Sequence, residues 1–315
     1  AMGGTAVSAP EASEQAASWR TAPEAIPDSE ITKTYDVDVA IIGMGYAGLS
    51  CYRELAEEGK NVLVLEAMPR ESWWTVGHDI GHINSDYLLS HGVPKVDEVE
   101  FLNNWMMQSH GKANPALVMK FAKNSGSTVD WWLDKINPDT LAKTRIHFWP
   151  DNEYTVHQLN NGMHYYTGTL EWWENSWENP ASGEKNNNTA GQLELKDLSW
   201  DNYNYVEENF SDNATALFGT KGVQLVMDGA KVTGVIAQDS DGNYLKINAK
   251  NGVVLAGGGF GGNKEMMDDL LPDIKRLFTK DEDFFAPFGR DGSTIQMGVW
   301  AGGRLEGDIS TMNFD

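Results

Sequence analysis

The fold is decided by the stretch Val37-Asp38-Val39-Ala40-Ile41-Ile42-Gly43-Met44-Gly45-Tyr46-Ala47-Gly48. Its first half is apolar and β-branched enough for a buried parallel strand, and its second half is a G-x-G-x-x-G pattern. Residues 49–58 then suit a helix that stops at Gly59, and residues 61–65 predict a second parallel strand. A strand, a glycine turn, a helix and a strand in this order form the βαβ unit that binds dinucleotides.

The three glycines of the pattern have separate roles. Gly43 permits the tight turn, Gly45 lets the backbone approach a diphosphate, and Gly48 lets the helix pack close to the strand. The N–H groups at the N-terminus of the helix would face the phosphates. The alternative is that the glycines serve only a tight turn between the strand and the helix.

A carboxylate ends the second strand. Glu66, which Ala67 follows, stands at the distance where an acidic side chain takes the ribose hydroxyls of an adenosine. The same charge would repel a 2′-phosphate, so we do not expect an NADP site.

The overall composition limits the class of function. With 315 residues, of which 41% are hydrophobic, the chain can form one large domain or two smaller ones. No stretch approaches the ~20 consecutive apolar residues of a membrane helix, so we expect no membrane span. The formal net charge of −22 argues against nucleic acid as a partner. It fits a solubilising surface or, alternatively, an attraction for a cationic redox partner.

The cysteine and histidine residues of the sequence give little indication of a metal site. Cys51 is the only cysteine, which excludes internal disulfides and thiolate-bound iron–sulfur clusters, and we expect it to be buried and inert. His78 and His82 have the i, i+4 spacing of a metal pair, but Gly77 and Gly81 argue against a helix there. We therefore predict no metal site.

Three segments before residue 222 outline the organisation of the chain. Residues 1–34 are poor in apolar periodicity and predict a disordered or linker arm. Such an arm is typical of the region after a removed export signal, and a plain disordered terminus is the alternative. Residues 99–136 show helical spacing of core residues. Residues 146–210 are rich in Trp, Tyr, Asn and Glu and predict an elaborated insert.

Regular structure returns at Gly222. Residues 223–227, 231–237 and 244–249 predict three strands joined by short turns, which is a β-meander. An apolar strand at 253–256 then runs into the glycine cluster 257–262. Glycines after a buried strand indicate a close approach of the backbone to a ligand or to another element.

These motifs together resemble the flavoprotein family of soluble fumarate reductases, urocanate reductases and 3-ketosteroid Δ1-dehydrogenases. Val253–Asn263 is similar to the family's V-V-L-A-T-G-G-F-G-G-N, with Gly257 in place of threonine. Lys231–Val235 resembles its meander signature. Arg290–Gly303 resembles its G-D-G-x-x-M-x-x-x-A-G-A element, and Gly77–Ser85 its glycine-rich loop that passes the flavin.

The resemblance implies an α/β fold with a Rossmann-like FAD-binding domain at 35–263, which includes the β-meander. Residues 264–315 would begin an inserted cap domain that binds substrate. FAD would be held without a covalent bond, with Glu66 on the ribose, Val223 near the adenine through its backbone, and Thr75, Gly77 and Gly81 along the pyrophosphate and flavin. The full set of expected cofactor-binding residues is Gly43, Gly45, Tyr46, Ala47, Gly48, Glu66, Ala67, Thr75, Gly77, Gly81, Val223, Ala256, Gly257 and Gly258.

The implied reaction is hydride transfer between flavin N5 and an activated C=C bond, with reduction of an α,β-unsaturated acid or enone. The partners would be that small-molecule substrate and a separate electron donor, either a cytochrome or a flavin protein. Two alternatives stay open. One is a flavin dehydrogenase that runs toward desaturation, and the other is a nucleotide-binding fragment or module without catalysis.

The resemblance also implies that the catalytic residues lie beyond Asp315. In the family, the element at Asp291–Gly302 is followed by the rest of the cap and by the residues that bind substrate and deliver the proton, so none is named in this chain. We therefore expect an incomplete enzyme. We also expect a bacterial protein, exported to the periplasm or cell surface after removal of its signal. The alternative is a cytoplasmic location.

Overall fold

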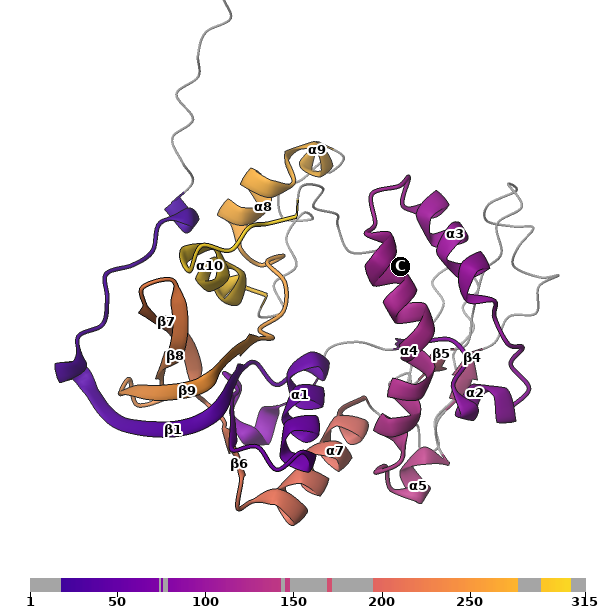
Figure 1. Ribbon diagram of the computed structural model, residues 1–315, viewed down its shortest axis with the longest axis horizontal. Coiled ribbons are helices and arrows are strands. Elements are labelled where there is room, and N and C mark those ends of the chain that lie inside the picture. Colours follow the sequence, from indigo (N-terminus) through magenta and orange to yellow (C-terminus); the bar gives the residue numbers. More distant parts are fainter. Residues whose placement is uncertain are drawn as a thin grey trace, which may run out of the picture. The chain divides into compact units, whose positions relative to one another are not determined.

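A computed structural model of the chain describes residues 18–73, 75, 79–142, 145–147, 169–171, 195–276 and 290–306. Two compact units divide the chain. The larger unit is Ile26–Gly258, and the smaller unit combines the residues up to Ala25 with those from Gly259 onward. Figure 1 shows the elements of both units in sequence colours.

Six of the described strands form the main sheet of the larger unit, in the order β6-β2-β1-β9-β8-β7. Parallel pairing joins β6, β2, β1 and β9, and antiparallel pairing joins β9, β8 and β7. The architecture is therefore α/β, with a Rossmann-like parallel half and a β-meander, as the sequence predicts. The strands are β1 (Ile31–Ile42), β2 (Val62–Leu65), β6 (Ala214–Leu217), β7 (Lys221–Asp228), β8 (Lys231–Gln238) and β9 (Tyr244–Leu255).

Strand β9 differs from the sequence prediction. Two separate strands are expected at 244–249 and 253–256, but the structure has one strand that pairs with β1 along most of its length, as Figure 1 shows. The register shifts between the pairs Val37↔Ala249 and Val39↔Gly252. Gly252 has a φ of +132°, which a residue with a Cβ adopts only with strain. This glycine lets the strand continue through the irregularity instead of ending there.

The N-terminal arm is also shorter than expected. Of the expected arm 1–34, residues 31–34 belong to β1, and a 3-10 turn, η2 (Asp28–Glu30), precedes them. Lys246 of β9 donates to the Asp28 carboxylate at 2.9 Å. Backbone pairing with β9 therefore extends β1 to residues that precede the apolar run. The side chains there can be polar, because the hydrogen bonds of the ladder come from the backbone.

The main core lies between the sheet and two helices, α1 (Tyr46–Glu57) and α7 (Leu195–Phe210). Leu49 and Tyr52 of α1 and Leu198 and Tyr203 of α7 are all buried in it. The last part of the expected insert 146–210 is thus a core helix of the larger unit.

The remaining helices of the larger unit begin at side-chain caps. Ser85, Asp97 and Asn114 each accept a hydrogen bond from a backbone N–H in the first turn that follows. A second sheet has the order β3-β5-β4. These elements are α2 (Asp86–Ser90), α3 (Glu98–Gln108), α4 (Pro115–Leu133), α5 (Pro138–Leu141), β3 (Asp79–Gly81), β4 (Arg145–His147) and β5 (Thr169–Glu171).

The smaller unit joins the first described residues to the last. Trp19 is 4% exposed, its Nε1 donates to Asp269 at 2.9 Å, and its carbonyl accepts from Trp300 Nε1 at 2.9 Å. The expected arm is therefore docked at this point, and residues 1–17 lie outside the described residues. The elements of the unit are η1 (Ser18–Arg20), α8 (Lys264–Leu270), α9 (Pro272–Lys275) and α10 (Ser293–Trp300).

No helix among the described residues has the length and apolar character needed to cross a bilayer. Nor does this part of the chain bring three or more His, Cys, Asp or Glu side chains together in a way that could hold a metal ion.

Candidate functional site

The glycine turn between β1 and α1 has three different environments at its three glycines. Gly43 has a φ of +93°, and a Cβ there would lie 2.5 Å from the carbonyl oxygen of Ala256. A Cβ on Gly48 would lie 1.8 Å from the carbonyl oxygen of Gly43. A Cβ on Gly45 would meet no atom of the described residues within 4 Å. Internal packing therefore explains the first and third glycines, whereas open space lies beside the second.

The N-terminus of α1 opens into the same space. Gly45 is its N-cap residue, in an extended conformation, and no side chain caps the helix. The N–H groups of a first helical turn lack intrahelical partners, and the helix dipole places partial positive charge there. Tyr46, Ala47 and Gly48 supply these groups, which suit an anion such as a diphosphate.

The carboxylate of Glu66 faces this turn. It is 8% exposed, and Oε2 accepts from the backbone N–H of Met44 at 2.9 Å. Oε1 accepts from the N–H of Met68 at 2.8 Å. A carboxylate offers about four lone-pair positions, so both oxygens keep capacity for the hydroxyls of a ribose. Ala67, which lies between Glu66 and Met68 in the sequence, is exposed.

The second glycine cluster meets the first at the ends of β1 and β9. The N–H of Ala256 donates to the carbonyl of Ile42 at 2.8 Å, and the Cα of Gly257 lies within 2.9 Å of a Cβ built on Gly43. Gly258 has a φ of +83°, and a Cβ there would meet no atom within 4 Å. The structure thus brings Ala256 and Gly257 to the glycine turn, and their role in cofactor binding stays a prediction.

The start of β7 lies near the same ends of the strands β1 and β2. The N–H of Thr220 donates to the carbonyl of Glu66 at 2.8 Å, and a Cβ on Gly222 would lie 2.8 Å from the side chain of Ile42. Strand β7 has a register shift between Gly222 and Gln224. Such a bulge leaves an extra residue out of the ladder, so the backbone of Val223 is available for a ligand.

Thr75 is buried beside the first turn of α1. The indole Nε1 of Trp73 donates to the carbonyl of Met44 at 3.2 Å, which holds the chain leading to Thr75 against the glycine turn. Thr75 is 2% exposed, and its hydroxyl lies 2.7 Å from that of Ser199 in α7. No motif pointed to Ser199, because it lies in the segment 146–210, which has no recognisable motifs.

The expected flavin loop is described only in part. Gly77 lies outside the described residues. Gly81 is in β3, where it pairs with Thr169 of the second sheet, and no contact described for it joins it to the glycine turn. The roles of both glycines stay predictions.

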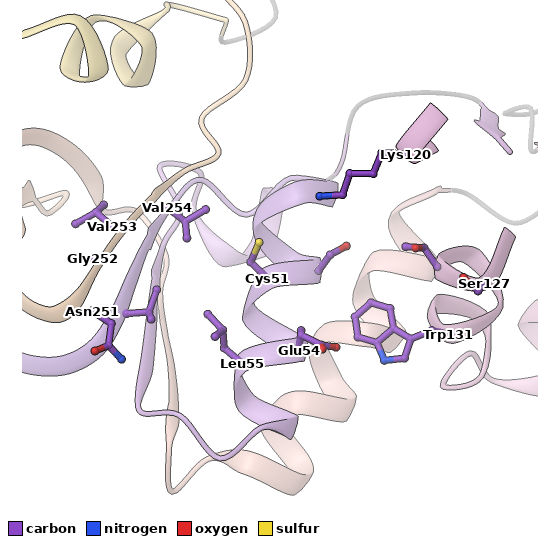
Figure 2. A pocket seen from close by; sticks show the side chains of 13 residues that line it. Cys51, Glu54, Leu55, Lys120, Ser127, Trp131, Asn251, Gly252, Val253 and Val254 are labelled. Carbon is purple, nitrogen blue, oxygen red and sulfur yellow. The ribbon is translucent and has the colours of Figure 1, made fainter. Parts of the chain in front are cut away.

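One cleft of the larger unit is separate from the expected cofactor residues. It has a volume of about 960 Å³ and lies between α1, α4 and the strands β1 and β9. Figure 2 shows Cys51, Leu55, Trp131 and Val254 among its lining side chains. Burial raises the pKa of the Cys51 thiol, and the nearby Glu54 carboxylate raises it further. A raised pKa disfavours the reactive thiolate. Cys51 is half-buried and lines the cleft, so the expectation that it is buried is wrong.

Comparison with known proteins agrees with this arrangement. The family described as FAD binding domain matches residues 38–313. An NADH:fumarate oxidoreductase of Klebsiella pneumoniae (strain 342) is 24% identical over 256 residues, which cover 78% of this chain and 23% of the relative. A urocanate reductase of Eggerthella lenta is 35% identical over 93 residues, 30% of this chain and 12% of the relative.

A solved structure supports the fold. The 3-ketosteroid-delta4-(5alpha)-dehydrogenase from Rhodococcus jostii RHA1 superposes with a TM-score of 0.63 at 20% identity, covering 87% of this chain and 56% of that one. The chain thus spans 23% of the fumarate oxidoreductase and about half of the solved dehydrogenase. Because the family match covers most of its length and includes both glycine clusters, the chain belongs to the FAD binding domain family of flavoproteins.

Proposed function

We propose that the chain binds FAD at the glycine turn and serves the reduction of an activated C=C bond in an α,β-unsaturated acid or enone. The observation that carries the proposal is the contrast between Gly48, where a Cβ would lie 1.8 Å from a backbone oxygen, and Gly45, where it would meet nothing within 4 Å. Internal packing requires the first to be glycine. It does not require the second, so the approach of a ligand is left as the reason.

The described residues fit the parts of FAD in a definite order. The N–H groups of Tyr46 and Ala47 would bind the diphosphate, Glu66 the ribose hydroxyls, and the bulge at Val223 the adenine edge. Thr75 would lie along the diphosphate and flavin. When bound, FAD supplies hydride chemistry at N5. The chain's own residues hold and orient the cofactor in surroundings from which water is partly excluded.

The substrate class rests on the relatives. One is named as acting on fumarate and another on urocanate, both unsaturated acids. The solved steroid dehydrogenase favours the reverse reaction, desaturation, as a second candidate. A separate electron donor and an exported location are part of the same proposal. A nucleotide-binding module without catalysis is its alternative.

An assay with a reduced dye separates these candidates. The FAD-loaded chain is mixed with reduced methyl viologen and a panel that includes fumarate, urocanate, acrylate and a steroid enone, and dye oxidation is followed. Saturable oxidation with an unsaturated acid supports reduction. Reduction of an oxidised dye by a saturated steroid ketone supports desaturation. Tight FAD binding without turnover in either direction supports the non-catalytic module.

A further inference from the structure

Three buried hydroxyl groups meet beside the first turn of α1. Thr75 Oγ1 and Ser199 Oγ lie 2.7 Å apart, and their residues are 2% and 0% exposed. The hydroxyl of Tyr46, the first residue of α1, lies next to both and is buried without a hydrogen-bond partner within the described residues. These three groups are called the hydroxyl cluster below.

Helix α7 supports the segment 73–75 at two neighbouring positions. Trp200 packs edge-on against Trp73, with ring centroids 4.9 Å apart, and Ser199 bonds to Thr75. The indole of Trp73 is itself bonded to the carbonyl of Met44 in the glycine turn. One helix therefore contacts both the Trp73 ring and the Thr75 hydroxyl.

The cluster has more donors than it uses internally. Three hydroxyls carry three hydrogens, and the bond between Thr75 and Ser199 uses one of them. Buried polar groups are almost always paired, and an oxygen of a bound ligand would supply a partner for the Tyr46 hydroxyl. Burial also raises the pKa of Tyr46, which keeps its hydroxyl protonated and able to donate.

We propose that Ser199 is a positioning residue for cofactor binding, which holds the Thr75 hydroxyl so that the hydroxyl cluster donates to an oxygen of the FAD diphosphate. This inference rests on the proposed function, because it takes FAD to lie at the N-terminus of α1. It assigns a role to α7 that the sequence did not indicate. Ser199 acts through Thr75 and is not itself a catalytic residue.

A double-mutant cycle tests the coupling. The variants are Ser199→Ala, Thr75→Val, and the two combined, with Thr75→Ser as the variant that keeps the hydroxyl. The readouts are the dissociation constant for FAD, measured by quenching of flavin fluorescence, and the melting temperature of the FAD-free protein. Ser125→Ala in α4, which removes a buried hydroxyl elsewhere in the same unit, is the matched control.

The expected result is a dissociation constant raised about 2- to 10-fold by Ser199→Ala, the range of one neutral hydrogen bond. Thr75→Val should raise it at least as much, and adding Ser199→Ala should then change nothing further. Thr75→Ser and Ser125→Ala should bind FAD like the parent. If the effects of Ser199→Ala and Thr75→Val multiply, or if Ser199→Ala binds FAD like the parent, the inference is wrong. If the parent chain itself does not bind FAD, the proposed function fails instead.

Discussion

The carboxylate of Glu66 accepts a hydrogen bond from the backbone N–H of Met44, the residue between the first two glycines of the turn, at 2.9 Å. This bond joins the end of β2 to the turn after β1. The residue that would bind the ribose therefore also shapes the loop that would bind the diphosphate.

Replacement of Glu66 should lower both FAD affinity and stability. Glu66→Ala removes a charged acceptor, so we expect a loss of about 1.5–3 kcal/mol in FAD binding, roughly ten- to hundred-fold. It also leaves the N–H groups of Met44 and Met68 without their acceptors, which should lower the free energy of unfolding by about 1–3 kcal/mol. Flavin fluorescence titration and urea unfolding measure the two effects. Parent-like FAD affinity in Glu66→Ala would remove the ribose assignment.

Substitutions at the glycines should separate binding from folding. Gly45→Val should cost the FAD-free protein no more than about 1 kcal/mol, the effect of a poorer N-cap residue, because no described atom lies within 4 Å of the new Cβ, but it should abolish FAD binding. Gly48→Ala should lower the unfolding temperature strongly, because its Cβ would lie 1.8 Å from the carbonyl oxygen of Gly43. Thermal unfolding and FAD titration of both variants measure this contrast. Equal stability losses in the two variants would mean that both glycines serve packing alone.

Gly258→Val should also reduce FAD binding, but with a cost in stability. Its φ of +83° strains any residue that has a Cβ, by about 1–2 kcal/mol, although the space around it is open. Gly258→Ala serves as the control, because it has the same strain with less bulk. A Gly258→Val protein that binds FAD as well as Gly258→Ala would show that no ligand approaches this glycine.

Arg53 should be the largest single contributor to stability among the charged residues of α1. It is 1% exposed, and its guanidinium bonds to Glu57, Asp134 and Asn202 at 2.7–2.9 Å. Loss of a buried ion pair costs about 3–5 kcal/mol, and we expect the lower end because the Asp134 side chain is 45% exposed. Urea unfolding of Arg53→Met measures the loss. Lys135→Ala, which removes a partly exposed partner of the same Asp134, should cost under about 1 kcal/mol.

His82 should make stability depend on pH below its ordinary pKa of 6.5. It is buried, Ser85 Oγ lies 2.8 Å from its Nε2, and the carbonyl of Ile80 lies 3.0 Å from its Nδ1. Burial lowers its pKa, and the Ile80 bond and Asp130 oppose this in part. His82 therefore binds a proton more readily in the unfolded chain than in the folded protein. The contribution of His82 to stability is fully present above pH 6.5. It is lost as the pH falls toward the pKa of His82 in the folded protein.

Urea unfolding between pH 7.5 and 5 checks this dependence against a His82→Gln variant, which cannot titrate. The parent should lose more stability than the variant over this range. Identical pH dependence in the two proteins would show that another group is responsible.

Local pattern was enough to predict the parallel strands, the glycine turn and the meander, because each depends on residues close together in sequence. Glu66 could be placed at the end of β2 for the same reason. Ser199 and Arg53 could not be predicted, because their roles come from packing between α7, α4 and α1, which are far apart in the chain. The continuous β9 was missed because Gly252 reads as a break, whereas pairing with β1 carries the strand through it.

Equilibrium titration of FAD fluorescence with the parent chain and with Gly45→Val tests the central claim most directly. The account predicts saturable binding of one FAD per chain by the parent and binding at least about a hundred-fold weaker by the variant, whose FAD-free form still unfolds cooperatively near the melting temperature of the parent. Absence of saturable binding by the parent, or equal binding by Gly45→Val, would contradict it.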